Sequence, residues 1–156
     1  KGVRRLEFGP LPKDAHADPT EAWPDLLHTA VAQVQEYFAG QRRSFDLPLD
    51  LDAVTEFQRE VYAELVRIPH GRVITYGDLA EAVGRADLAR AVGQAVGANP
   101  VPILIPCHRV VAAEGRLGGF TGGLAVKAAL LRTENVDVEG ENETSRIRPE
   151  VLRLEL

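Results

Sequence analysis

The sequence predicts an α/β protein of the α+β type. It combines a small N-terminal sheet-and-helix subdomain with a mostly helical, winged helix-turn-helix domain. Three observations favour this class. Helix-start patterns recur in the middle of the chain, short runs of valine and isoleucine lie between the predicted helices, and glycine or proline separates the elements. With 156 residues, the chain has room for one domain, or for one domain with a small appendage.

Residues 1–52 are predicted to form the N-terminal subdomain, expected to be incomplete, and a linker that begins near residue 41. A strand is predicted over 3–8, because glycine and proline end it, and a loop over 9–24. A helix is predicted over 25–39. It rests on an apolar stripe of six side chains: Leu26, Leu27, Ala30, Val31, Val34 and Phe38.

The second predicted domain, residues 53–134, opens with a capping box. Thr55 followed by Gln58 predicts a helix start there. One apolar face then follows, made of Phe57, Val61, Leu65 and Ile68. Thr75 followed by Asp78 predicts a second helix start, because an acidic side chain in the first turn suits the helix dipole.

This second start predicts helices over 76–83 and 87–97, joined by a short turn. Helix, turn and helix together form the outline of a helix-turn-helix. The inward residues of the second helix are expected to be Leu88, Ala91, Val92, Ala95 and Val96. On pattern alone the outline is weak, because many helix pairs share it.

Beyond Asn99 the chain alternates between short apolar runs and loops. Residues 101–105 and 110–111 are predicted to be buried strands, because the runs are brief and rich in β-branched residues. A glycine-rich loop surrounds Phe120, and a helix is predicted over 124–133. The last segment, 135–156, is predicted to be an acidic tail with a terminal strand over 146–156.

Composition excludes several classes of protein. The net charge of −5 argues against a nucleic-acid partner, yet residues 85–132 carry 6 basic and 2 acidic side chains. With one cysteine, a disulfide scaffold and a multi-thiolate zinc site are excluded, which fits a reducing, cytoplasmic compartment. No apolar run reaches the ~18 residues of a membrane span, and no signal peptide is recognisable. The absence of methionine indicates that the chain does not begin at its native N-terminus.

Cys107 is the first candidate for chemistry. A lone cysteine in an apolar run is most often a small buried hydrophobe. Here it follows Pro106 and precedes His108 and Arg109, and a neighbouring imidazole or cation raises the thiolate fraction that a nucleophile needs. In an extended strand His108 would point to the opposite face, so contact would require a tight turn or a bridging water.

His108 would need a carboxylate to orient it as a base. Glu134, at the predicted end of the last helix, is the candidate, although a solvated helix-end carboxylate is the simpler interpretation. The other histidines have no metal-ligand spacing, so no metal site is expected: His16, His28 and His70. The glycines near Phe120 do not match a phosphate-binding fingerprint and indicate a pocket wall instead.

Together these residues resemble the O6-alkylguanine-DNA alkyltransferase family. The run Ile105–Val111 (IPCHRVV) resembles the active-site motif of the family, and the likeness extends over about residues 55–134. Other matching positions, in the family's order and spacing, are Phe57–Val61, Ile68–Pro69, Gly71, Val73–Gly77, Leu79–Ala80, Ala89–Gly93, Asn99–Pro100, Gly122–Leu124 and Lys127. The tract Tyr37–Gly40 is similar to the end of the family's N-terminal helix.

The resemblance implies a DNA-repair protein, a methylated-DNA–protein-cysteine methyltransferase that needs no cofactor. It would bind double-stranded DNA through the minor groove and flip out an O6-alkylguanine, or alternatively an O4-alkylthymine. The alkyl group would move irreversibly to Cys107, once per molecule. The protein would be a monomer in solution, with clustering on DNA as an alternative, and would be found at the nucleoid of a bacterium or in the nucleus of a eukaryote.

The resemblance also implies roles for individual residues. His108 would reach Cys107 through a water and be held by Glu134, and Asn99 would be the hinge between the helix-turn-helix and the active-site strand. Arg90 would fill the gap left by the flipped base, and Tyr76 would crowd its phosphate. The other DNA contacts expected are Ala89, Ala91 and Arg109, and the substrate pocket is expected to contain Pro102, Val110, Phe120 and Thr121.

Two departures from the family pattern stand out. The family commonly has a tyrosine at the position of Phe120, whose hydroxyl would bond the leaving guanine, so slower transfer is expected here. The family's opening β-hairpin is also missing, and the tail near 151–156 is one candidate to take its place in the sheet. Other interpretations stay open: a silent lesion-binding relative, a helix-turn-helix regulator with a structural cysteine, and a cysteine hydrolase.

Overall fold

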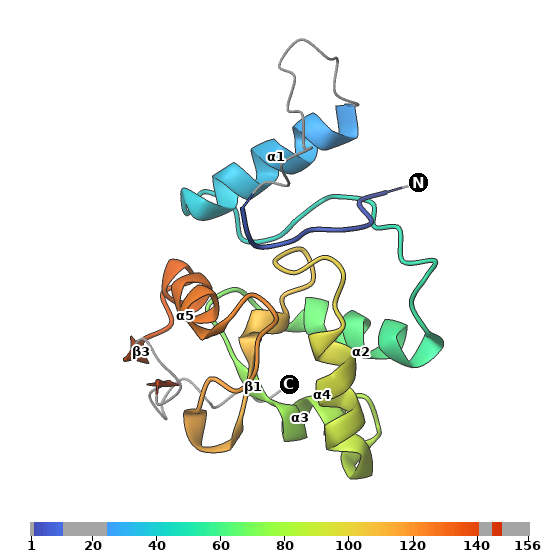
Figure 1. The fold of residues 1–156 in the computed structure, drawn as a ribbon, viewed down its shortest axis with the longest axis vertical. Helices are drawn as coiled ribbons and strands as arrows, with labels where there is room; N and C mark the ends of the chain where they lie inside the picture. Colours follow the sequence, from blue (N-terminus) through green and yellow to red (C-terminus); the bar gives the residue numbers. More distant parts are fainter. Residues whose placement is uncertain (1, 11–24, 141–144, 148–156) are drawn as a thin grey trace.

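The computed structural model describes residues 2–10, 25–140 and 145–147. In Figure 1, α1 (Asp25–Phe38) lies above a larger body that holds the remaining helices, and the chain just after the N-terminus runs between the two. The body contains α2 (Glu56–Arg67), α3 (Tyr76–Ala82), α4 (Ala89–Gly97) and α5 (Leu124–Thr133). Helices combined with small, separate two-stranded sheets confirm the α+β class.

The predicted strand over 3–8 is wrong as a regular strand. Val3 makes a single parallel bridge to Leu49, with backbone hydrogen bonds to Pro48 and Asp50. Farther along, the Leu6 amide donates to the Pro100 carbonyl over 2.9 Å. No described strand runs alongside the segment. These separate backbone hydrogen bonds hold it in place instead.

The helix predicted over 25–39 is confirmed as α1, but its buried face is rotated from the predicted stripe. Phe38 is 53% exposed and Leu27 is 44% exposed, whereas Gln33 and Tyr37 are buried. Hydrogen bonds of two polar side chains determine which face of the helix is buried. The Gln33 side chain accepts a hydrogen bond from the Asp46 amide, and the Tyr37 hydroxyl bonds a buried carboxylate.

Both predicted helix starts are confirmed. Thr55 caps α2 in a full capping box with Gln58, and Thr75 caps α3 in a second box with Asp78. Each box satisfies amide groups that have no partner inside the helix. The predicted inner face of α2 is confirmed for three buried residues and half-buried Phe57: Val61, Leu65 and Ile68.

The helix-turn-helix is present. The 3₁₀ turn η1 (Ala86–Leu88) joins α3 to α4, so the second helix begins two residues later than predicted. Leu88, expected to point inward, is 37% exposed, because it belongs to this turn rather than to the helix. The rest of the predicted inner face is buried or half-buried, so α4 packs on α2 and α3.

The predicted strand over 101–105 is also wrong. Asn99 organises this segment as a tight loop: its Nδ2 donates to the Ile105 carbonyl over 2.8 Å, and its Oδ1 accepts from the Val101 amide over 3.1 Å. Ile103 sits in the left-handed region, with φ of 74°, which a strand does not allow. All five residues are nevertheless buried, so the apolar pattern reported burial and not strand geometry.

A parallel pair of short strands holds the centre of the body. Strand β1 (Ile74–Thr75) pairs with β2 (Val110–Val111) directly after the 3₁₀ turn η2 (Cys107–Arg109). A third 3₁₀ turn, η3 (Ala113–Gly115), follows. The pairing places the cysteine turn beside the start of α3, because the paired residues Ile74 and Val110 are 36 positions apart in the sequence.

The described part of the tail forms an antiparallel pair, β3 (Val138–Glu139) with β4 (Arg146–Ile147). Ile147 is buried against the second apolar core, which also contains Val111, Leu117 and Leu131. The tail strand expected to continue to residue 156, and the suggestion that it replaces a hairpin, lie outside the described residues.

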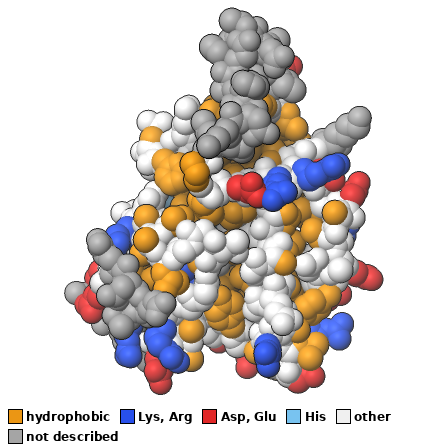
Figure 2. All heavy atoms as spheres, in the orientation of Figure 1, with side chains coloured by type: hydrophobic (Ala, Val, Ile, Leu, Met, Phe, Trp, Pro, Cys, Tyr) orange, Lys and Arg blue, Asp and Glu red, His pale blue; other side chains and the backbone are white. Residues whose placement is uncertain are grey.

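The main core lies under α2, α3 and α4 and includes Cys107. On the surface, Figure 2 shows hydrophobic side chains along the band between the upper part that carries α1 and the lower body. Within the described ranges, no helix has the length and apolar character needed to cross a membrane.

Candidate active site

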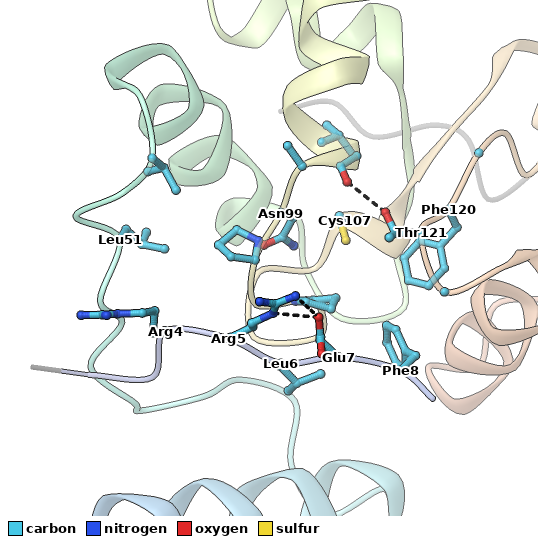
Figure 3. Close-up of a pocket in the computed structure, with 18 of the residues that line it drawn as sticks. Arg4, Arg5, Leu6, Glu7, Phe8, Leu51, Asn99, Cys107, Phe120 and Thr121 are labelled. Carbon is cyan, nitrogen blue, oxygen red and sulfur yellow. Dashed lines mark hydrogen bonds and ion pairs between the residues drawn. The ribbon is translucent and has the colours of Figure 1, made fainter. Parts of the chain in front are cut away.

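A cavity of about 950 Å³ opens between the helix-turn-helix and the N-terminal segment. The Cys107 side chain lies at its inner end, only 5% exposed, with its sulfur pointing into the cavity (Figure 3). Segment 4–8 forms the opposite wall, and Phe120 and Thr121 lie on one side. The single cysteine is therefore buried yet reachable from the cavity.

The surroundings of the Cys107 thiol act on it in opposite directions. Burial raises the pKa of the thiol and outweighs the effects that lower it, which are a hydrogen bond from Asn99, the charge of Lys127 and backbone hydrogen bonds from Cys107 and His108. At neutral pH the resting group is therefore the thiol. A base is needed to form the thiolate that attacks.

The turn η2 resolves the geometry of the adjacent histidine. Because Cys107 and His108 lie in a 3₁₀ turn and not in a strand, the imidazole turns into the interior and is 0% exposed. Its Nε2 lies 2.8 Å from Oε1 of Glu134. An ionised carboxylate only accepts, so Nε2 is the donor and the proton sits on that nitrogen.

This tautomer leaves the other ring nitrogen as an acceptor. Nδ1 of His108 is buried and has no hydrogen-bond partner among the described residues. Burial lowers the pKa of His108 despite the nearby Glu134. A neutral imidazole with a free acceptor nitrogen has the form that a general base requires.

Glu134, the C-cap of α5, is the centre of a buried polar cluster. Its carboxylate accepts from the Tyr37 hydroxyl at 2.8 Å, the Gly71 amide at 3.1 Å, the His108 imidazole and the Arg109 guanidinium. Burial alone would raise the pKa of Glu134, but the hydrogen bonds from His108 and Arg109 prevail and hold it well below its usual range. We call these four side chains the Glu134 cluster.

Arg109 lies inside the protein, not at a DNA-facing surface. It is 5% exposed, and its Nε and Nη2 each bond Glu134 over 2.9 Å in a bidentate pair. Its Nη1 bonds the Ile68 carbonyl over 2.5 Å. A guanidinium buried and paired in this way does not reach the surface, so we assign Arg109 to the Glu134 cluster and not to the DNA contacts.

Lys127 from α5 is completely buried. Its Nζ donates to the carbonyls of Val110 at 2.6 Å, Leu117 and Gly119, and burial lowers its pKa to about 8. The lysine thereby joins β2 to the glycine-rich loop. Its positive charge also acts to lower the pKa of the Cys107 thiol.

The glycine-rich loop is fastened to the helix-turn-helix at two points. The Thr121 hydroxyl donates to the Gly97 carbonyl at the end of α4 over 2.9 Å, and the Tyr76 hydroxyl donates to the Gly119 carbonyl over 3.3 Å. Tyr76, Thr121 and Pro102 line the cavity, as do Phe120 and Asn99. We expected Val110 to line the pocket, but its side chain is fully buried and does not line the cavity.

The remaining predicted DNA contacts lie on the recognition helix. Arg90 is exposed on α4, and Ala89 and Ala91 beside it are half-buried. None of the three lines the cavity. The structure thus separates a helix surface, which includes Arg90, from the cavity that holds Cys107.

Sequence reasoning missed two polar side chains of the site. In the sequence, Tyr37 stands out only as part of a tract similar to the family, and Lys127 only as a matching position. Both carry a signal. Lys127 stands three and four residues before buried Leu130 and Leu131, on the inner face of its helix, where a lysine needs a polar partner. Tyr37 falls one residue before the predicted stripe position Phe38.

The fold and the site together define a DNA-binding helix-turn-helix protein with a buried cysteine beside a histidine–glutamate pair. A family profile described as "6-O-methylguanine DNA methyltransferase, DNA binding domain" matches residues 56–136, and the corresponding "ribonuclease-like domain" matches residues 1–51. The chain belongs to the 6-O-methylguanine DNA methyltransferase family.

Relatives carry the same description. The methylated-DNA–protein-cysteine methyltransferase of Mycobacterium tuberculosis is 43% identical over 132 residues, covering 85% of this chain and 78% of its own. The protein of that name from Mycolicibacterium paratuberculosis is 50% identical over 111 residues, covering 71% and 67%.

Solved structures give the same fold. The M. tuberculosis OGT in complex with DNA has a TM-score of 0.68 and 46% identity, covering 72% of this chain and 69% of that chain. S. pombe Atl1 in complex with damaged DNA containing O6-carboxymethylguanine has a TM-score of 0.55 and 30% identity, covering 64% and 95%.

Proposed function

We propose that this protein repairs DNA by transferring the alkyl group of an O6-alkylguanine to the sulfur of Cys107, once per molecule. The observation that carries the proposal is the arrangement around the thiol. Cys107 points into a cavity of about 950 Å³, a size typical of small-molecule sites, and a buried histidine–glutamate pair adjoins it. Family membership supplies the substrate class.

The chemistry balances without a cofactor. A bond forms between Sγ and the alkyl carbon, and the bond between that carbon and O6 breaks. The thiol loses its proton, and the leaving guanine gains one at its ring nitrogen. We assign His108 to accept the thiol proton at Nδ1, through one bridging water, because that nitrogen is an unpartnered acceptor.

Glu134 and Asn99 hold the reacting groups. Glu134 fixes the histidine tautomer, since its carboxylate accepts the Nε2–H and is itself held by Arg109. Asn99 closes the loop that ends the recognition helix and delivers the chain to Cys107. The thioether product has no thiol proton to lose, and a thiolate is a poor leaving group from an alkyl carbon. The alkyl group therefore stays on Cys107, and each molecule reacts once.

DNA would approach the exposed side of α4. Small side chains at Ala89 and Ala91 let the helix backbone come close to a minor groove, and Arg90 is free to enter the base stack. Tyr76, at the start of α3 and on the cavity wall, would turn the phosphate of the flipped nucleotide. Flipping is required because the cavity is reached from the surface and the reactive carbon is otherwise stacked.

The test is intact mass spectrometry after mixing with a duplex that carries one O6-methylguanine. We expect a gain of one methylene per protein, mapped to Cys107, saturating at one equivalent and absent in Cys107→Ala. An unchanged mass together with tighter binding of the damaged duplex would overturn the transfer and indicate a lesion-binding protein. Repeated turnover of an acyl substrate would indicate a hydrolase.

The role of Arg90 is tested separately. Arg90→Ala is expected to slow transfer from the duplex by about tenfold or more, while alkylation by the free base O6-benzylguanine stays unchanged, because the free base needs no flipping. Arg85→Ala is the matched control, because Arg85 is an exposed arginine just before the turn η1. Equal loss with both substrates would contradict a role in flipping.

A further inference from the structure

The cavity wall that faces Cys107 comes from outside the helix-turn-helix domain. Residues 4–8 run along it, anchored where the Leu6 amide bonds the Pro100 carbonyl over 2.9 Å. Pro100 belongs to the loop that leads to Cys107, so the segment and the nucleophile share one support. In Figure 3 the sulfur points across the cavity toward this segment.

The wall has a charged part and an aromatic part. Arg5 and Glu7 pair with each other, which neutralises the central part (Figure 3). At one end, the Phe8 ring lies against Phe120, with ring centroids 5.6 Å apart and the planes tilted by 51°. Both rings line the cavity and are only half-buried, so each keeps apolar surface toward the substrate space.

The absence of a side chain at Gly122 makes this aromatic pair possible. A Cβ there would lie 2.7 Å from Cδ2 of Phe8 and 3.0 Å from Cε1 of Phe120. Both rings therefore pack directly on the loop backbone. Phe8 supports Phe120 from the N-terminal side, and the two form an apolar corner of the cavity that also holds the thiol.

We propose that Phe8 is a specificity-determining residue, which with Phe120 forms an aromatic corner that favours large, planar O6-substituents such as benzyl. This inference rests on the alkyl transfer proposed above. An O6-methyl group is too small to reach the ring surfaces of this corner. A benzyl ring gains ring–ring contacts there, because tilted and edge-to-face aromatic packing is favourable beyond the area it buries.

The experiment compares single-turnover transfer from two duplexes that differ only in O6-methylguanine or O6-benzylguanine. Phe8→Ala is expected to lower the benzyl rate constant by about tenfold and the methyl rate constant by less than about twofold. Phe8→Leu keeps apolar bulk without the ring, so its benzyl rate should fall between the two. Phe38→Leu, a half-exposed phenylalanine on α1 outside the cavity, is the matched control.

The outcomes separate the two proposals. Loss of methyl transfer in the unmodified protein overturns the proposed function and with it this inference. Methyl transfer with an unchanged benzyl-to-methyl ratio in both Phe8 variants overturns the specificity role alone. A ratio that rises in Phe8→Ala also overturns it, because Phe8 would then obstruct the benzyl group. If Phe8→Ala does not fold, Phe8→Leu decides through the same ratio.

Discussion

The inner and outer sides of the Cys107 cavity differ in burial, in charge and in how they are held by hydrogen bonds. On the inner side, the Glu134 cluster is fully buried, charged and bonded between four separate parts of the chain. On the outer side, the pocket wall is a glycine-rich loop and an extended segment, held at a few points and lined by half-buried aromatic rings. One side fixes a proton acceptor, and the other accommodates a substrate.

The difference shows where stability and specificity are each determined. Changes in the Glu134 cluster are expected to alter the free energy of unfolding, because a buried charge that loses its partner is costly. Changes in the wall are expected to alter rates and substrate preference while leaving the fold intact. Each prediction below tests one side against the other.

The largest effect is expected for Glu134→Ala. Removing the carboxylate leaves the Arg109 guanidinium buried without its counter-charge, so we expect a loss of about 3–5 kcal/mol in the free energy of unfolding, measured by urea denaturation. Glu64→Ala is the control, because Glu64 pairs with Arg67 in an exposed i,i+3 bridge worth less than about 1 kcal/mol. Similar losses in both variants would contradict the comparison.

Next in size is Tyr37→Phe. The hydroxyl bonds a charged acceptor, so its removal is expected to cost about 1.5–3 kcal/mol of stability. Tyr62→Phe provides a matched loss, since the equally buried Tyr62 hydroxyl bonds the neutral Ala95 carbonyl, worth about 0.5–1.5 kcal/mol. Thermal and urea unfolding of both variants measure the difference. A smaller cost at Tyr37 than at Tyr62 would contradict the special status of the cluster.

On the wall, Phe120→Tyr is expected to accelerate transfer. Loss of one well-placed donor costs about 10²–10³ in rate in other enzymes, so a hydroxyl added beside the leaving guanine should recover part of this, about tenfold. Single-turnover assays with an O6-methylguanine duplex measure the rate constant of transfer. The free energy of unfolding should change by less than about 0.5 kcal/mol. An equal or lower rate would show that the missing hydroxyl does not limit this protein.

The smallest effect is expected in the pH dependence of stability. The pKa values of His108 and Glu134 are both lowered in the folded protein, so the unfolded chain binds more protons once the pH falls below about 6.5 for the imidazole and 4.5 for the carboxyl. Stability should therefore decline from pH 7 to 5 and further below 4.5. Urea midpoints at several pH values measure this slope. Between pH 7 and 5 it should become shallower in His108→Gln, with a remainder from His70, whose pKa burial also lowers.

The sequence predicted what depends on local chemistry. Both capping boxes, the buried face of α2 and the order of the helices follow from side chains a few residues apart. It failed where distant polar groups decide. The stripe on α1 rotated because Tyr37 reaches a carboxylate 97 residues away. The strand over 101–105 became a loop because the Asn99 side chain replaces ladder partners.

The same distinction holds for the site. Cys107, His108 and Glu134 could be proposed from a motif and a helix end, and the structure brings the last two within hydrogen-bond distance. The position of Arg109 could not be predicted, because an arginine next to a cysteine in the sequence can contact DNA or form a buried ion pair. Only the three-dimensional position of Glu134 decides between them. The contribution of Phe8 likewise depends on how the N-terminal segment crosses the cavity.

The sequence contains one cysteine and no methionine. The Sγ atom of Cys107 is the only sulfur in this sequence. An X-ray absorption spectrum at the sulfur edge of the purified protein therefore reports on this one atom, with no background from the rest of the chain. Thiol, thiolate and thioether differ in their edge spectra, so the chemical state of the reacting atom can be followed directly, without a label or a substitution.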